Sequence, residues 1–166
     1  MERGLPAEER GGVIRLLAGI GVGVAALSVI FGVTIWRNHS TFRDYQTATL
    51  DSEAAPPRWD TEELSVEQCV QASVGWAMDC PGIASWCLAE LPVVMERCLA
   101  SQDRTAYCEQ VGDEVMTTRF GFHACEDLRA EMDDDAEKYA KRANKKYCAA
   151  SYRAAAEHCL VLRGLR

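Results

Sequence analysis

The longest hydrophobic run of the chain begins shortly after its N-terminus. Residues 16–36 form a stretch of 21 residues without a charged side chain. A helix of that length rises about 30 Å, which is the thickness of the hydrocarbon core of a bilayer. The run ends at Trp36, and Arg37 and Arg43 follow it, as is typical of a membrane interface. The pattern predicts a single transmembrane helix over 16–36, embedded in a lipid bilayer, after an N-terminal tail over 1–15.

Acidic residues before the run favour an uncleaved anchor. Glu2, Glu8 and Glu9 precede it, and no Ala-x-Ala cleavage site follows it. Signal peptides have shorter apolar regions and end at such a site, whereas transit peptides are poor in acids. We therefore expect a single-pass membrane protein.

Small residues recur through the predicted membrane helix. Gly19 and Gly23 form a Gly-x-x-x-Gly pair. Pairs with this spacing allow two helix backbones to approach closely in lipid. We expect such residues to pack against other transmembrane subunits of a membrane complex, and the open alternative is ordinary membrane-helix composition, in which glycine is common. The expected packing residues are Gly19, Gly21, Gly23, Ala25, Ser28 and Gly32.

A polar segment over 37–60 follows and is interpreted as a stalk. Pro56 and Pro57 lie near its end, and each proline disfavours helix in the residue before it. We expect a folded cysteine-rich domain over 61–166, beginning near Thr61.

Helical periodicity dominates the first part of that domain. Ser65 and Gln68 have the spacing of a capping box. Cys69, Trp76 and Cys80 then fall at i, i+7 and i+11 on one helical face. Pro81 and Gly82 are a strong stop signal.

A second apolar stripe repeats this spacing. It includes Cys87, Leu91, Val94 and Cys98. Pro92 interrupts it, and a proline is tolerated only near the start of a helix, so the second helix is expected to begin around 88–91. The two stripes predict a helical hairpin over 65–100.

The rest of the domain also favours helix. A third helix is expected over 103–120, with Gly121 as its terminator. The segment 126–163 is rich in Ala, Glu, Lys and Arg and predicts one long helix, or two with a break near Asn144. Few segments alternate with period two, so the predicted fold is all-α, with a second helical unit over 103–163.

Eight cysteines all lie after residue 68, and none forms a Cys-x-x-Cys pair. This absence counts against zinc ribbons, thioredoxin-like sites and iron–sulfur ferredoxins, so no cofactor or metal is expected. Disulfides persist in oxidising compartments. Together with a weak excess of arginines before the membrane run, this predicts an inside N-terminus and a domain in the mitochondrial intermembrane space or the bacterial periplasm.

The cysteine spacing constrains the pairing. Cys69 and Cys80 are 11 residues apart, as are Cys87 and Cys98. Two such residues lie about 16 Å apart along a helix, beyond the reach of about 7 Å that a disulfide allows. The simplest solution is a hairpin with nested bridges, Cys80–Cys87 inside and Cys69–Cys98 outside.

The other four cysteines leave two pairings open. A nested copy joins Cys108 to Cys159 and Cys125 to Cys148, and it requires a break in the C-terminal helix. The alternative joins Cys108 to Cys148 and Cys125 to Cys159.

Helical hairpins with two cysteines per helix and nested disulfides resemble the coiled-coil-helix-coiled-coil-helix proteins of the mitochondrial intermembrane space. The residues that carry the resemblance are Cys69, Cys80, Cys87 and Cys98, and more loosely Cys148 and Cys159. The family pattern has nine intervening residues where this chain has ten, and its members often lack a membrane helix. The resemblance implies an accessory subunit of a respiratory membrane complex.

Two histidines lie near cysteines, as His123-x-Cys125 and His158-Cys159, but no set of four ligands with converging spacing is visible. No Ser/His/Asp order, P-loop or His-Glu-x-x-His motif occurs either, so we expect no enzyme.

Charge limits the partners that the chain can bind. The net charge is −7, which argues against binding nucleic acid through phosphates. Residues 44–166 hold 13 basic and 22 acidic side chains. We expect a non-catalytic, membrane-anchored accessory or assembly subunit of a larger membrane complex. The alternative is a free-standing anchored protein whose acidic domain captures a basic soluble partner.

Overall fold

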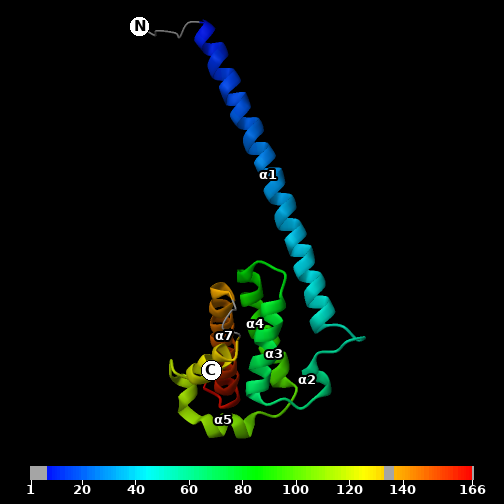
Figure 1. The fold of residues 1–166 in the computed structure, drawn as a ribbon, viewed down its shortest axis with the longest axis vertical. Helices are drawn as coiled ribbons and strands as arrows, with labels where there is room; N and C mark the ends of the chain where they lie inside the picture. The colour runs from blue at the N-terminus through cyan, green and yellow to red at the C-terminus, as the bar shows by residue number, and fades with distance from the viewer. Residues whose placement is uncertain (1–6, 133–136, 166) are drawn as a thin grey trace. The chain divides into compact units, whose positions relative to one another are not determined.

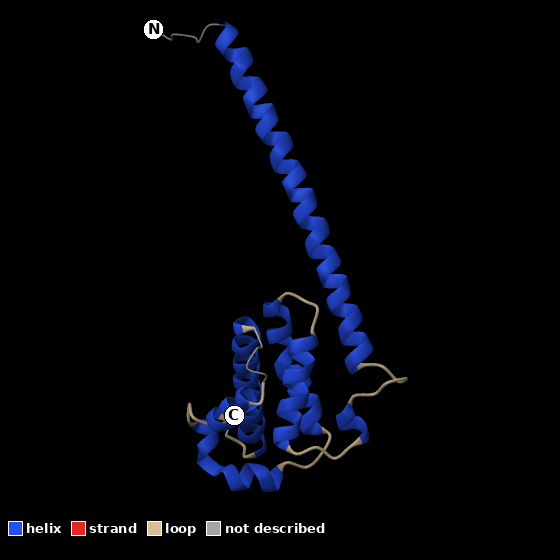
Figure 2. Ribbon diagram, in the orientation of Figure 1, coloured by secondary structure: helices blue, strands red, loops and turns tan. Residues whose placement is uncertain are grey.

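The computed structural model describes residues 7–132 and 137–165, with side chains from Ile20 onward. All regular structure in these ranges is helical (Figure 2). The chain is therefore an all-α protein with an apolar N-terminal helix and a disulfide-bonded helical domain, as the sequence predicts. The first six residues of the expected tail, the side-chain environment of Gly19, and the run Asp133 to Asp135 lie outside the described residues.

Helix α1 covers Ala7–Leu50 and contributes to two compact units, Met1–Ser40 and Thr41–Arg166. In the first unit the side chains from Ile20 to Trp36 are exposed. Among the described residues, α1 supplies one helix that is long and apolar enough to cross a membrane.

The last part of α1 corrects the expected start of the folded domain. Phe42 and Leu50 are buried, so the second unit begins at Thr41 and not near Thr61. Within this unit the hydroxyl of Tyr45 donates a 2.8 Å hydrogen bond to the carbonyl oxygen of Trp76. This packing was not predicted because most residues in 37–60 are polar, which is typical of a stalk. The few apolar side chains among them recur at helical spacing.

The predicted hairpin is present as α3 (Val66–Asp79) and α4 (Ala84–Ala100), and it follows a single turn, α2 (Arg58–Thr61). The capping box is confirmed: Gln68 N donates to Ser65 Oγ, and Ser65 N donates to Gln68 Oε1. The expected stop at Pro81 is also confirmed, because α3 ends at Asp79.

The expected start of the second helix around 88–91 is wrong. Helix α4 begins at Ala84 and contains Pro92 in its interior. On one side of the proline Cys87 is bridged to Cys80, which caps the end of α3, and on the other side Cys98 is bridged to Cys69 within α3. These bridges stabilise α4 where an unattached helix would break.

The expected third helix is also too long. Helix α5 covers only Thr105–Val111, and a 3₁₀ helix, η1, continues over Gly112–Met116. Gly121 does not terminate a helix. It is the N-cap of α6 (Phe122–Ala130), with φ +73°.

The C-terminal segment forms α7, Lys138–Leu162. The break therefore precedes Lys138, and the expected break near Asn144 is wrong, because Asn144 lies buried within α7. Beyond the end of the helix, Gly164 has φ +68°, and the N–H groups of Gly164 and Leu165 donate to the carbonyls of Val161 and Leu160. This is a Schellman motif, and it satisfies carbonyls that the last turn leaves open.

Helices α3, α4 and α7 pack side by side around the main core (Figure 1). Helix α5 follows α4, and both α5 and α6 contact α7 or its neighbours. The largest fully buried side chains belong to α3 and α4: Val70, Leu91, Val94, Met95 and Leu99.

Four disulfides join these helices: Cys69–Cys98, Cys80–Cys87, Cys108–Cys159 and Cys125–Cys148. These are the pairs of the two nested arrangements. Their Cα–Cα distances lie between 5.1 and 6.1 Å. Because every bridge connects two different segments, the helices are crosslinked in the way that helical spacing of the cysteines demands.

Candidate binding groove

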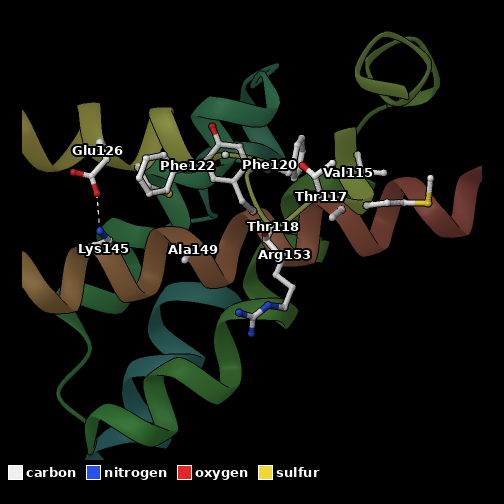
Figure 3. Close-up of a pocket in the computed structure, with 14 residues that line it drawn as sticks. Val115, Thr117, Thr118, Phe120, Phe122, Glu126, Lys145, Ala149 and Arg153 are labelled. Atoms are coloured by element: carbon white, nitrogen blue, oxygen red, sulfur yellow. Dashed lines mark hydrogen bonds and ion pairs between the residues drawn. The ribbon is translucent and has the colours of Figure 1, made fainter. Parts of the chain in front are cut away.

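A groove opens where the outer face of α7 meets the start of α6 and the loop after η1 (Figure 3). Its volume is about 350 Å³, which falls at the lower end of the range for ligand pockets. Its lining combines aromatic, aliphatic and charged side chains: Val115, Met116, Thr117, Thr118, Phe120, Gly121, Phe122, Cys125, Glu126, Lys145, Ala149, Tyr152, Arg153 and Ala156.

The inner end of the groove depends on a close contact at Gly121. A Cβ atom built there would lie 2.1 Å from Cγ of Tyr152, so only glycine fits. Phe120 packs edge-on against the same tyrosine ring, with centroids 5.5 Å apart. Burial raises the pKa of Tyr152, with Glu67 as a lesser cause. These contacts fix the loop against α7.

Two apolar side chains on the loop side remain open to solvent. Met116 is 59% exposed and Phe122 is 49% exposed. Methionine and aromatic residues are enriched in protein interfaces. Both side chains therefore add exposed apolar surface to the lining of the groove.

The opposite wall is a row of α7 residues at successive spacings of four: Lys145, Ala149 and Arg153. Ala149 leaves the space between the two cations empty. Lys145 donates a 2.7 Å hydrogen bond to Glu126, and its Nζ lies 5.6 Å from the ring centroid of Phe122. This hydrogen bond is the main cause that lowers the pKa of Glu126, and the charge of Arg129 adds to it.

Arg153 forms no hydrogen bond or ion pair with any residue in the described ranges. Its side chain is exposed and extends from α7 away from the phenylalanine rings (Figure 3). Arg153 contributes to the lining of the groove, and a guanidinium without a partner in the described part of the chain can bind a carboxylate in a bidentate manner.

The charge of α7 differs from that of the chain as a whole. Helix α7 carries six Lys or Arg residues and one Glu, whereas the chain has a net charge of −7. The exposed bases lie on the outer side of the helix: Lys138, Arg142, Lys145, Lys146 and Arg153. The groove is therefore a basic and apolar site on an otherwise acidic domain.

The histidines do not gather into a metal site. Within the described ranges no three metal-ligating side chains come together. His158 Nδ1 lies 3.0 Å from both carboxylate oxygens of Glu96, and this contact links α7 to α4. His123 stacks edge-on against Phe122. The neighbouring Cys125 and Cys159 are both in disulfides.

The expected membrane-packing residues lie on a helix that the chain itself leaves uncovered. Gly21, Ala25, Ser28 and Gly32 follow one another at i, i+4, i+7 and i+11, so they share one face of α1. A Cβ built on Gly21, Gly23 or Gly32 would meet nothing within 4 Å. Ser28 donates to the carbonyl of Val24.

No protein-family model, curated protein or solved structure matches the chain. The resemblance to intermembrane-space hairpin proteins therefore stays a prediction from the cysteine pattern. The groove was not predicted from the sequence. The basic composition of α7 is the one signal of the groove in the sequence. The other side of the groove was missed because the loop that forms it lies in a segment that was expected to be helical.

Proposed function

We propose that this protein is a non-catalytic, membrane-anchored subunit that contributes to the assembly of a larger membrane complex. The anchor is the apolar part of α1, and the disulfide-bonded domain lies on the oxidising side of the membrane. The observation that carries the proposal is the uncovered small-residue face of α1, formed by Gly21, Ala25, Ser28 and Gly32.

Glycine in a helix costs up to about 1 kcal/mol relative to alanine. At Gly21, Gly23 and Gly32 of α1, a side chain would meet no neighbour within this chain, so its packing does not require glycine there. In lipid, small residues at four-residue spacing gain their stabilisation when another helix approaches closely. Packing within this chain does not explain the glycines of α1, whereas close packing against a partner helix explains them.

The domain supports the same role. Four disulfides and a core of three helices make it a rigid body. Rigid domains of this kind present surfaces to partners with little entropy lost on binding.

The test is native electrophoresis of membranes solubilised in mild detergent. The double variant Gly21→Leu/Gly32→Leu should lose co-migration with a large complex, because leucine blocks close approach of a second helix. The matched control is Val22→Leu/Val29→Leu, which changes exposed residues about a quarter-turn away and should still co-migrate. If the unsubstituted chain migrates alone, or if the two double variants behave alike, the proposal is wrong.

A further inference from the structure

We infer that the groove docks a short acidic segment of a partner protein, which inserts an apolar side chain beside Phe122 and pairs a carboxylate with Arg153. The inference rests on the proposed subunit role in one respect, which is that the acidic segment belongs to another protein of the same complex. A synthetic peptide tests the groove itself, so its failure is distinct from failure to assemble.

The apolar half of the site is concave. Phe122 and Met116 both line the groove, and Ala149 lies on the α7 side between Lys145 and Arg153 (Figure 3). A side chain inserted beside Phe122 would remove exposed apolar surface from water at about 25 cal/mol per Å². A cavity of about 350 Å³ accommodates side chains, whereas a flat lipid surface does not fill it.

The polar half of the site selects the sign of charge. Arg153 has no partner among the described residues, whereas Lys145 pairs with Glu126 and lies over the ring of Phe122. Further bases lie along the same helix, at Arg142 and Lys146. A carboxylate-bearing segment laid along α7 therefore meets cations over the two turns from Lys145 to Arg153, about 12 Å.

The acidic remainder of the domain restricts the length of this segment. Its field repels a long acidic chain, but charges are screened beyond about 10 Å at 0.1 M salt. A short segment confined to α7 feels mainly the local bases. This is why the groove fits a brief acidic and apolar stretch and not an extended acidic tail.

The experiment uses the full chain in nanodiscs of zwitterionic lipid, with ¹³C-methyl methionine labels. Met116 reports from the groove, and the fully buried Met95 serves as an internal reference. The probe is a short soluble peptide of glutamates interrupted by leucines. Two matched peptides replace its glutamates by lysines or its leucines by serines. The glutamate–leucine peptide should shift the Met116 signal saturably and bind at least about tenfold more tightly than either control.

Two pairs of variants locate the binding. Arg153→Glu should weaken binding of the glutamate–leucine peptide by about tenfold, whereas Arg58→Glu makes the same change in net charge on α2 and should leave it within about twofold. Ala149→Leu fills the groove and should abolish the Met116 shift, whereas Ala100→Leu changes an exposed alanine of α4 and should not. Circular dichroism checks that each variant retains its helix content.

Several results would overturn the inference. If the lysine–leucine peptide binds equally well, the groove does not select acidic segments. If Arg153→Glu and Arg58→Glu weaken binding equally, the peptide responds to the net charge of the chain and not to Arg153. An unchanged Met116 shift in Ala149→Leu places the peptide elsewhere. A Met116 shift caused by anionic lipid in the nanodisc, with no response to the peptide, assigns the surface to the membrane.

Discussion

The guanidinium of Arg104 donates a 2.8 Å hydrogen bond from Nη1 to the carbonyl oxygen of Leu64. The same group donates to the carbonyls of Leu99 and Cys98 at the end of α4, and it lies 3.6 Å from Sγ of Cys69. Arg104 is only 6% exposed, and burial lowers its pKa, although an arginine keeps its charge. One buried cation thus joins the approach to α3 with the C-terminus of α4, beside the Cys69–Cys98 bridge.

Replacing Arg104 should therefore be costly. Arg104→Met removes several charge-assisted hydrogen bonds to buried carbonyls, and we expect a loss of about 3 kcal/mol in the free energy of unfolding. Arg104→Lys retains the charge but not the planar fork of donors, and we expect a loss of about 2 kcal/mol. Urea titration followed by tryptophan fluorescence measures both. The exposed Arg58→Met should change stability by less than about 1 kcal/mol, and an equal loss there would refute the assignment.

Gly121→Ala should destabilise the domain through two separate effects. The φ of +73° disfavours any residue with a Cβ, and that Cβ would also overlap the ring of Tyr152. We expect a loss of about 3 kcal/mol, from backbone strain and overpacking together. Gly164→Ala is the matched control, because its φ of +68° is also positive but its Cβ would meet nothing within 4 Å. It should cost only about 1 kcal/mol in the same urea titration.

Limited reduction should open the disulfides in a defined order. Cys80 is half-buried, whereas the other seven half-cystines are buried. A dithiol attacks a sulfur that it can reach, so the Cys80–Cys87 bridge should be reduced first. Alkylation after brief reduction, followed by mass spectrometry, should label these two cysteines before Cys108 or Cys159.

The same bridge closes a short loop, and its removal should have a moderate cost. By loop entropy, a bridge between residues seven apart stabilises by about 2.5 kcal/mol. The Cys80→Ser/Cys87→Ser variant should therefore stay folded with that loss. Simultaneous labelling of all eight cysteines in the native protein would show instead that reduction proceeds through global unfolding.

Alkaline pH should unfold the domain through its tyrosines. Burial and, secondarily, the charge of Asp79 raise the pKa of Tyr45 from 10.0 to about 12. The folded state thus favours the neutral phenol, and this contribution is complete below pH 10 and lost as the pH rises toward 12. Burial also raises the pKa of Tyr107, Tyr147 and Tyr152, so the effects add.

The free energy of unfolding should therefore fall steadily above about pH 10. Tyr45→Phe should start about 1 kcal/mol less stable, because it loses the hydrogen bond to the carbonyl of Trp76, and its curve should fall less steeply. Tyr139→Phe, at a side chain that is 77% exposed, is the control and should follow the original curve. A pH-independent stability up to pH 12 would contradict this account.

Local patterns along the chain were sufficient for several features. The apolar run 16–36, the capping box at Ser65 and the stop at Pro81 each depend on residues within a few positions of one another. The all-α class followed from helical periodicity. The cysteine spacing led to the hairpin bridges, because the rise of a helix forbids a bond between cysteines 11 residues apart.

Features that depend on distant contacts required the tertiary structure. The sequence left two pairings open for Cys108, Cys125, Cys148 and Cys159, and the position of the break before α7 decides between them. The start of α4 was predicted too late in the chain, because proline is usually tolerated only near the start of a helix. Crosslinks on both sides of Pro92 outweigh this local preference.

The groove belongs to the same category. Gly121 is required because Tyr152 lies against it, and these two residues are 31 positions apart in the sequence. The basic composition of α7 is visible in the sequence, but the open apolar wall beside it is not, because exposure of Phe122 and Met116 is decided by which helices fold over them. Helix formation is local and can be read from residue types, whereas burial and cavity shape arise from segments that meet only in the folded chain.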